Sequence, residues 1–205
     1  MKLIIIGPPG SGKGSQAELL ENKLNLKHIP LGEILRDEIR KNTTIGKKVK
    51  RISKGSLAPD YVVDKLVKKI IKGKNNFILD GYPRHLAQAK YLDKITRIDK
   101  VFLLDTPSNL IIKRLSNRRV CKCGETYNLL TKKPKKDSTC DKDGKKLYQR
   151  DDDTPKIIKK RIKLYKKQTI PVINYYKKKK LLIKIDSSKS LKQVFNEIKN
   201  KLYKR

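Results

Sequence analysis

The chain has 205 residues, with 53 Lys and Arg against 20 Asp and Glu, so its formal net charge is +33. A chain of this length holds one well-buried α/β domain with insertions and leaves little room for two full independent domains. Its apolar runs are too short to span a membrane, and Gly7-Pro8-Pro9 interrupts the first run too early for a signal peptide, which predicts a cytoplasmic protein.

The elements expected along the chain alternate between strands and helices. Apolar runs predict four strands, at residues 3–6, 76–80, 100–105 and 181–185. Helical patterns lie between them and after them, at residues 16–24, 32–41, 60–72, 86–93, 108–117, from about 153 onward, and at 191–202. This alternation predicts an α/β fold with a parallel sheet covered by helices on both faces. Residues 30–59 and 118–149 interrupt it and predict two insertions, the first placed before the second predicted strand.

The first motif joins the strand at 3–6 directly to Gly-x-x-x-x-Gly-Lys at residues 7–13. Glycines let successive backbone N–H groups converge on one anion, and the helix that follows offers its positive N-terminus. Lys13 can reach the outer phosphates of a nucleotide, and the Ser15 hydroxyl can face Mg²⁺. The strand, loop and helix together predict a phosphate-binding loop (P-loop).

A second motif follows the strand Phe77-Ile78-Leu79-Asp80. A carboxylate at the end of such a strand is where a P-loop enzyme holds Mg²⁺ through its waters. The next residues, Gly81-Tyr82-Pro83-Arg84, predict a tight turn that presents a guanidinium beside the cleft. The planar guanidinium fork matches phosphate oxygens.

These motifs resemble the adenylate kinase family in its long-lid form, together with Gly32–Arg36, Gln88-Ala89, Arg118-Arg119, Gln149–Asp153 and Arg161 in similar order and spacing. The resemblance covers essentially the whole chain. It implies a P-loop NTPase-type core at 1–29, 60–116 and 154–205, a helical AMP-binding insertion at 30–59, and a small zinc-type lid insertion at 117–153. It also implies a monomer that reversibly transfers a phosphoryl group from MgATP to AMP, giving two ADP.

The resemblance also assigns residues to each nucleotide. The ATP site would comprise Gly10, Ser11, Gly12, Lys13, Gly14, Ser15, Arg114, Arg118, Thr126, Tyr127 and Lys189. The AMP site would comprise Leu31, Arg36, Ser56, Leu57, Ala58, Gly81, Tyr82, Pro83, Arg84, Gln88, Arg150 and Arg161. Leu31 stands where the family has a hydroxyl residue, so recognition of the base relies more on Gln88 and backbone groups.

Positioning and charge neutralisation supply most of the acceleration in phosphoryl transfer, so no general base is needed. The catalytic groups implied are Lys13, Arg84, Arg118, Arg150 and Arg161. Ser15 and Asp80 would hold Mg²⁺, while Asp152 and Asp153 would latch the closed lid. His28 and His85 are expected to be packing or surface residues.

The cysteines of the chain, Cys121, Cys123 and Cys140, resemble the zinc knuckles of this lid. Three thiolates and one carboxylate complete a tetrahedral shell, and a reducing cytosol favours metal binding over disulfides. Asp143 stands where many family members have a fourth cysteine, with Asp141 or Asp137 as alternatives. The first knuckle is Cys-x-Cys where the family usually has Cys-x-x-Cys, so its turn must differ. A structural Zn²⁺ would stabilise a segment too small and polar for a core of its own.

The scattered lysines fit a solvated surface, and no platform of aromatic and basic residues accompanies them. We therefore expect small-molecule partners (ATP, AMP and ADP) and no dedicated nucleic-acid partner. Two alternatives remain at this point. One is a kinase for UMP or CMP, although those relatives have short lids. The other is a basic P-loop ATPase that RNA activates.

Overall fold

A parallel sheet of five strands lies at the centre of the molecule. The computed structural model describes residues 1–50 and 58–203. The strands follow the order β2-β3-β1-β4-β7 across the sheet, with bounds β1 Lys2–Ile6, β2 Lys27–Pro30, β3 Phe77–Asp80, β4 Lys100–Asp105 and β7 Leu182–Asp186. In the central register Ile4 lies opposite Leu79 of β3 and Val101 of β4. The predicted parallel α/β fold is confirmed.

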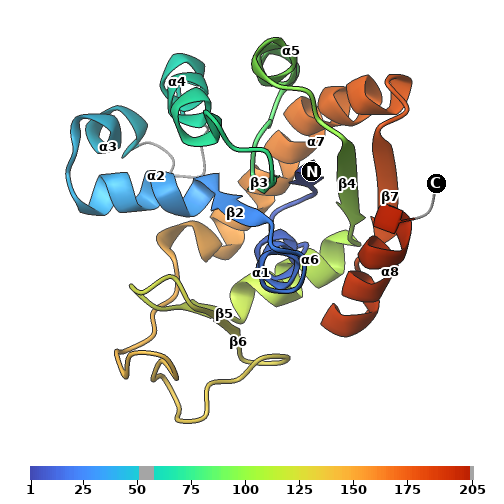
Figure 1. Ribbon diagram of the computed structural model, residues 1–205. Coiled ribbons are helices and arrows are strands. Elements are labelled where there is room, and N and C mark those ends of the chain that lie inside the picture. Colours follow the sequence, from blue (N-terminus) through green and yellow to red (C-terminus); the bar gives the residue numbers. More distant parts are fainter. Residues whose placement is uncertain (51–57, 204–205) are drawn as a thin grey trace.

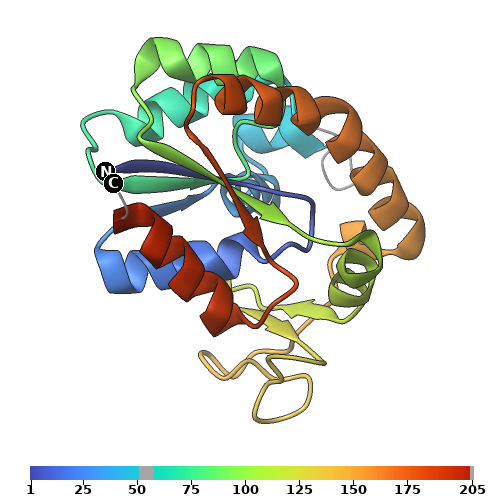
Figure 2. The ribbon, with the colours of Figure 1, turned by 90° about the vertical axis from the view of Figure 1, so that its right-hand side faces the viewer.

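Helices cover both faces of this sheet (Figure 2). One face carries α1 (Lys13–Leu24) and α8 (Leu191–Tyr203), and the other carries α4 (Asp60–Ile71), α5 (Leu86–Ile95) and α7 (Pro155–Lys178). Successive side chains of a strand point to opposite faces. In β1, Leu3 and Ile5 pack with the α1 and α8 side, whereas Ile4 and Ile6 pack with the other. The apolar run in β1 is therefore continuous because both its faces are buried.

Two lobes stand beside the central sheet (Figure 1). The first contains α2 (Leu31–Arg40) and α3 (Thr44–Val49), which follow β2 directly. The second follows α6 (Ser108–Ser116) and contains the antiparallel strands β5 (Arg118–Val120) and β6 (Thr126–Asn128). The 3-10 turn η2 (Asp151–Asp153) leads from it into α7. Both lobes begin within the stretches predicted as insertions.

The strand β2 is missing from the sequence-based prediction, which placed the second strand at 76–80. Lys27-His28-Ile29-Pro30 lacks a continuous apolar run because β2 is an edge strand, paired only with β3. Proline is tolerated at such an edge. The other predicted strands and helices occur close to their expected bounds, and α7 begins with Pro155 in its first turn as predicted. Within residues 1–50 and 58–203, no helix has both the length and the apolar character needed to cross a bilayer.

The burial of β1 predicts a large loss of stability from truncation of Ile4, which is 0 % exposed. We expect Ile4→Ala to lower the free energy of unfolding by about 2–5 kcal/mol, because it removes buried methyl groups and leaves a cavity. Denaturant unfolding measures this change. The matched control is Ile170→Ala, since Ile170 is 45 % exposed and should change the same quantity by less than about 0.5 kcal/mol. Equal losses in the two variants would contradict the assignment of β1 to the core.

Candidate active site

A cavity of about 1240 Å³ is lined by residues from the ends of β1 and β3, the loop after β1, and both lobes. In open parallel sheets, ligands bind in the crevice at the carboxyl ends of the strands. The residues that line this cavity therefore form the candidate site.

The loop after β1 is shaped by its glycines. Gly10 has φ +78° and Gly12 has φ +91°, in the left-handed region that favours glycine. A Cβ atom on Gly10 would also lie 2.8 Å from Leu115 Cγ in α6, so a side chain there meets a packed neighbour. Gly12 precedes α1 and provides no side-chain cap, which leaves the first N–H groups of the helix for an anion.

Lys13 lies across this loop. Its Nζ donates to the carbonyl oxygens of Gly7 at 3.0 Å and Pro8 at 2.8 Å. Burial lowers the pKa of Lys13 to about 8, an effect that the nearby Asp80 carboxylate opposes. The loop thus places a partly desolvated ammonium where an anion would favour its charged form.

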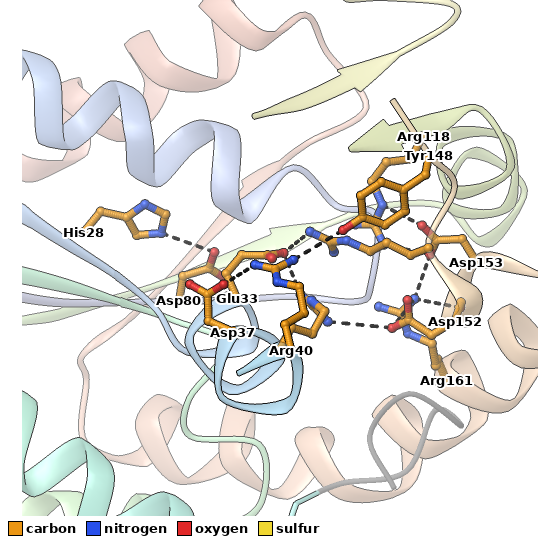
Figure 3. Close-up of polar contacts among 12 residues, drawn as sticks. His28, Glu33, Asp37, Arg40, Asp80, Arg118, Tyr148, Asp152, Asp153 and Arg161 are labelled. Carbon is orange, nitrogen blue, oxygen red and sulfur yellow. Dashed lines mark hydrogen bonds and ion pairs between the residues drawn. The ribbon is translucent and has the colours of Figure 1, made fainter. Parts of the chain in front are cut away.

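Arginines from four separate segments converge on the cavity: Arg36, Arg84, Arg118, Arg150 and Arg161. Carboxylates offset part of this charge (Figure 3). Arg118 donates from Nε and Nη2 to the two oxygens of Asp153, both at 2.7 Å, and Arg161 Nη1 donates to Asp153 Oδ1 at 2.9 Å. Asp153 is fully buried, so this arrangement satisfies its charge with two guanidinium groups.

A second carboxylate, Glu33, joins the first lobe to the segment before α7. Glu33 accepts from Arg36 Nη2 at 2.8 Å and also from Arg150. Arg36 Nη1 further lies 3.9 Å from Asp152 Oδ2. Glu33 was not among the predicted site residues. Its spacing of three residues from Arg36 in a helix could have indicated their ion pair. No sequence signal indicated its pairing with Arg150, which is 117 residues away.

Arg84 occupies the turn predicted after β3. Its Nε donates to Gly81 O at 2.9 Å, and its own carbonyl accepts from Thr169 Oγ1 at 2.9 Å. Burial lowers the pKa of Arg84 to about 10, with the neighbouring Arg161 and Arg36 contributing to this shift. Like charges this close disfavour each other unless an anion lies between them.

Asp80 ends β3 beside the P-loop, since its Oδ2 lies 3.6 Å from the position that a Cβ atom would take on Gly14. His28 Nε2 lies 3.4 Å from the same oxygen, and both side chains are largely buried. His28 therefore faces the Asp80 carboxylate, as Figure 3 shows, whereas the sequence predicted only a packing or surface residue. The sequence did not predict this contact because it did not predict β2, the edge strand that holds His28 beside β3.

Most residues predicted for the two nucleotides lie together in the cavity wall. These are Gly10, Ser11, Gly12, Lys13, Gly14, Ser15, Leu31, Arg36, Ala58, Asp80, Gly81, Pro83, Arg84, Gln88, Arg114, Arg118, Thr126, Tyr127, Arg150, Arg161 and Lys189. Tyr82 is the exception, because it is fully buried outside the wall and its hydroxyl donates to Asp64 Oδ1 at 2.7 Å. The predicted residues Ser56 and Leu57 lie outside the described residues.

A candidate metal centre lies apart from this wall, in the second lobe. One ligand atom from each of Cys121, Cys123, Cys140 and Asp143 lies within 4.8 Å of all the others. Cys123 Sγ and Cys140 Sγ are 3.6 Å apart, far beyond a disulfide bond of about 2.05 Å. Two thiolates on tetrahedral Zn²⁺, with Zn–S bonds of about 2.3 Å, lie about 3.8 Å apart. The donor set and its spacing therefore fit zinc.

The fourth member of this cluster is Asp143. A hydrogen bond from Cys121 Sγ, at 3.2 Å, is the main cause that lowers the pKa of Asp143 to about 2. Asp141 Oδ1 instead accepts from the Lys135 N–H at 2.8 Å. The Tyr127 hydroxyl lies next to this cluster of four residues, 3.6 Å from Cys140 Sγ.

The fold and the site together define a P-loop enzyme that handles nucleotide phosphates. The family model described as adenylate kinase matches residues 5–181. An adenylate kinase of Petrotoga mobilis is 46 % identical over 98 % of this chain and 96 % of its own length. Those of Methanothrix thermoacetophila and Archaeoglobus fulgidus are each 42 % identical, with at least 96 % of both chains covered. The chain belongs to the adenylate kinase family, and it is a nucleoside monophosphate kinase.

The buried position of Asp153 predicts that its charge is needed for stability. We expect Asp153→Asn to lower the free energy of unfolding by about 2–3 kcal/mol, because Arg118 and Arg161 lose their shared carboxylate. Thermal or denaturant unfolding measures this effect. Asp151→Asn is the matched control on the same turn, and because Asp151 is exposed its effect should stay below about 0.5 kcal/mol. A loss of the same size in both variants would mean that Asp153 contributes no more than a surface charge.

Proposed function

We propose that the cavity binds MgATP and AMP at the same time. Its arginines would promote direct transfer of the terminal phosphoryl group from ATP to AMP. The observation that carries this proposal is a single cavity lined by both the P-loop and a separate set of partly buried arginines. Its volume of about 1240 Å³ exceeds the range of roughly 300–1,000 Å³ typical of a site for one small ligand. Two nucleotides with facing phosphates account for this size and charge.

The P-loop end of the cavity would hold ATP. The free N–H groups of the loop and of the first turn of α1 would bind the β- and γ-phosphates, with the Lys13 ammonium reaching them as well. Arg114, from α6, donates to the Ser187 carbonyl at 2.9 Å, and its planar group would lie against the adenine. Thr126 and the backbone near Lys189 would complete this end.

The opposite end would hold AMP, with Arg36 and Arg84 on its phosphate and Gln88 at its base. Leu31 and Ala58 line this end with apolar surface, and both are largely buried. The positions of Arg84 and Gln88 support this assignment. Arg84 lies in the turn before α5 and Gln88 in the first turn of that helix, where Gln88 Oε1 accepts from the Arg84 N–H at 2.8 Å.

In the transfer, a phosphate oxygen of AMP forms a bond to the γ-phosphorus while the bond from that phosphorus to the β–γ bridging oxygen breaks. ADP leaves with the bond electrons, and the AMP phosphate is already anionic, so no base is required. Arg118, Arg150 and Arg161 would neutralise the charge spread over the equatorial oxygens. Mg²⁺ supplies further neutralisation when bound with ATP. Ser15 and Asp80 would hold it, because a hydroxyl and a carboxylate offer the oxygen ligands that it prefers.

The insertions at 30–59 and 117–153 would close over the cavity and exclude water, which would otherwise accept the phosphoryl group. Contacts between the two lobes support this role. Arg40 Nη1 of α2 donates to the Tyr148 hydroxyl at 3.3 Å, and Glu33 pairs with Arg150. The core at 1–29, 60–116 and 154–205 would stay fixed. In that closed state Asp152 and Asp153 would hold Arg161 and Arg118 in place.

We further propose that the cysteine cluster holds a structural Zn²⁺. The small core beside it consists of Tyr127, Leu147 and two of the cysteines, which is too little apolar surface to order the lobe alone. Thiolate ligation requires reduced cysteines, which supports a cytoplasmic location. Residues of a single chain line both ends of the cavity, so the proposed reaction needs no partner subunit, and we propose a monomer that acts on small nucleotides.

The acceptor specificity follows from this assignment. With MgATP as donor, we expect rapid phosphoryl transfer to AMP and little to CMP, UMP or GMP, in a coupled assay that measures nucleoside diphosphate. Addition of RNA should leave the rate unchanged. Preferred transfer to UMP or CMP would favour the first alternative, and ATP hydrolysis that RNA stimulates without any acceptor would favour the second.

The proposed zinc site predicts one equivalent of zinc per chain in protein purified without chelators. Asp143→Ala should lose most of this metal and lower the melting temperature, because one of four ligands is gone. Asp137→Ala is the matched control, since Asp137 lies outside the cluster and should retain the metal. Metal analysis and thermal unfolding provide the readouts. Equal zinc content in both variants would remove Asp143 from the ligand set.

A further inference from the structure

The Gln88 side chain is held at both ends of its amide. Gln88 lies in the first turn of α5, lines the cavity and is 3 % exposed. Its Oε1 accepts from the Arg84 N–H at 2.8 Å, and its Nε2 donates to Asp60 Oδ1 at 3.1 Å. A backbone N–H only donates and a carboxylate only accepts. The two bonds therefore fix which end of the amide is oxygen and which is nitrogen.

The carboxylate in this arrangement is itself supported. Asp60 is the first residue of α4, and His85 Nε2 lies 2.5 Å from the same Oδ1 that accepts from Gln88. One turn later in α4, Asp64 accepts from the Tyr82 hydroxyl, which lies 3.3 Å from the Gln88 carbonyl oxygen. Helix α4 is thus linked to the start of α5 twice, directly through Asp60 and indirectly through Asp64 and the Tyr82 hydroxyl. Only Asp60 contacts the side-chain amide of Gln88.

The atoms of the amide that remain available carry the specificity. Nε2 has a second hydrogen and Oε1 a second lone pair, and their order in space is fixed by the two bonds. Such a pair matches a base edge on which an amino donor stands beside a ring-nitrogen acceptor, as in adenine. A 6-oxopurine has a carbonyl acceptor in place of the amino group, so it matches the amide only after the amide turns over.

Turning the amide over is opposed by both partners. It would bring Nε2 against the Arg84 N–H, two donors, and Oε1 against the Asp60 carboxylate, two acceptors. The Gln88 amide is buried, so leaving it unpaired costs more than a hydrogen bond gains, and the 47 % exposed Asp60 side chain adds the repulsion of two facing acceptors. Leu31, buried in the same cavity, has no polar group to compensate for a mismatched base.

We propose that Asp60 is a specificity-determining positioning residue, whose hold on the Gln88 amide makes the acceptor site select a 6-aminopurine monophosphate over a 6-oxopurine monophosphate. This inference rests on the proposed function, in which Gln88 faces the acceptor base. Asp60 itself is not among the residues that line the cavity. It acts through Gln88.

The test compares kcat/KM for AMP and for IMP, which differ at the 6-position, in the intact protein with MgATP as donor. We expect Asp60→Asn to lower the AMP/IMP ratio about tenfold, mainly through KM, because an amide at position 60 either donates or accepts and leaves only the Arg84 N–H to oppose turnover of the Gln88 amide. Asp64→Asn is the matched control. It removes the same charge from the same helix without contact to the amide, so it should leave the ratio unchanged.

His85→Ala provides a second variant, with a smaller fall of the ratio in the same direction, because Asp60 loses one partner but keeps Gln88. It carries the test if Asp60→Asn lowers the melting temperature below the assay temperature. A substitution that only disturbs the packing of the site lowers kcat/KM for AMP and for IMP together and leaves their ratio unchanged. A ratio in both variants within about twofold of the wild type, which itself prefers AMP, therefore overturns the role of Asp60. Absence of transfer to AMP by the wild-type protein would instead overturn the proposed function.

Discussion

Desolvation of positive charge around the cavity is the constraint on which the remaining structure depends. Lys13 and Arg84 both have a pKa lowered by burial, and Arg84 also by the guanidinium groups beside it. Grouping like charges away from water costs free energy. Asp80, Asp152 and Asp153 offset this cost only in part. A polyphosphate supplies the missing negative charge, so substrate binding and local stability share one electrostatic balance.

The distribution of these charges along the chain explains how the lobes and the chemistry are connected. Lys13 begins α1 directly after the P-loop and Arg84 lies in the turn after β3, whereas Arg36, Arg118 and Arg150 come from the lobes and the segments that join them. Carboxylates such as Glu33 and Asp153 link arginines of different segments. The structure brings these cations to one cavity, so the proposed closure of the lobes would couple charge neutralisation to the exclusion of water.

Behind the residues that touch the cavity lies a layer that fixes their orientation. Helix α4 contributes Asp60 and Asp64, which reach the Gln88 amide and the Tyr82 hydroxyl. His28 lines the cavity itself and reaches Asp80 from the edge strand. Asp60 does not need to contact a nucleotide to affect which one is accepted, because it decides how the donor and the acceptor of Gln88 are presented.

The sequence by itself determined the parallel α/β fold, the P-loop, the carboxylate at the end of β3 and the arginine in the turn after it. Each of these is encoded by consecutive residues, since an apolar run, a glycine pattern or a turn sets its own backbone conformation. The resemblance also named Asp143 beside the cysteines, and the structure has it there rather than its equivalent neighbour Asp141. Only the tertiary structure decided that residues 27–30 form an edge strand and that Glu33 pairs with Arg150, because these partners are far apart in the chain. Packing between elements decides which charges and polar groups meet. Local sequence patterns carry no information about contacts between residues that are far apart in the chain.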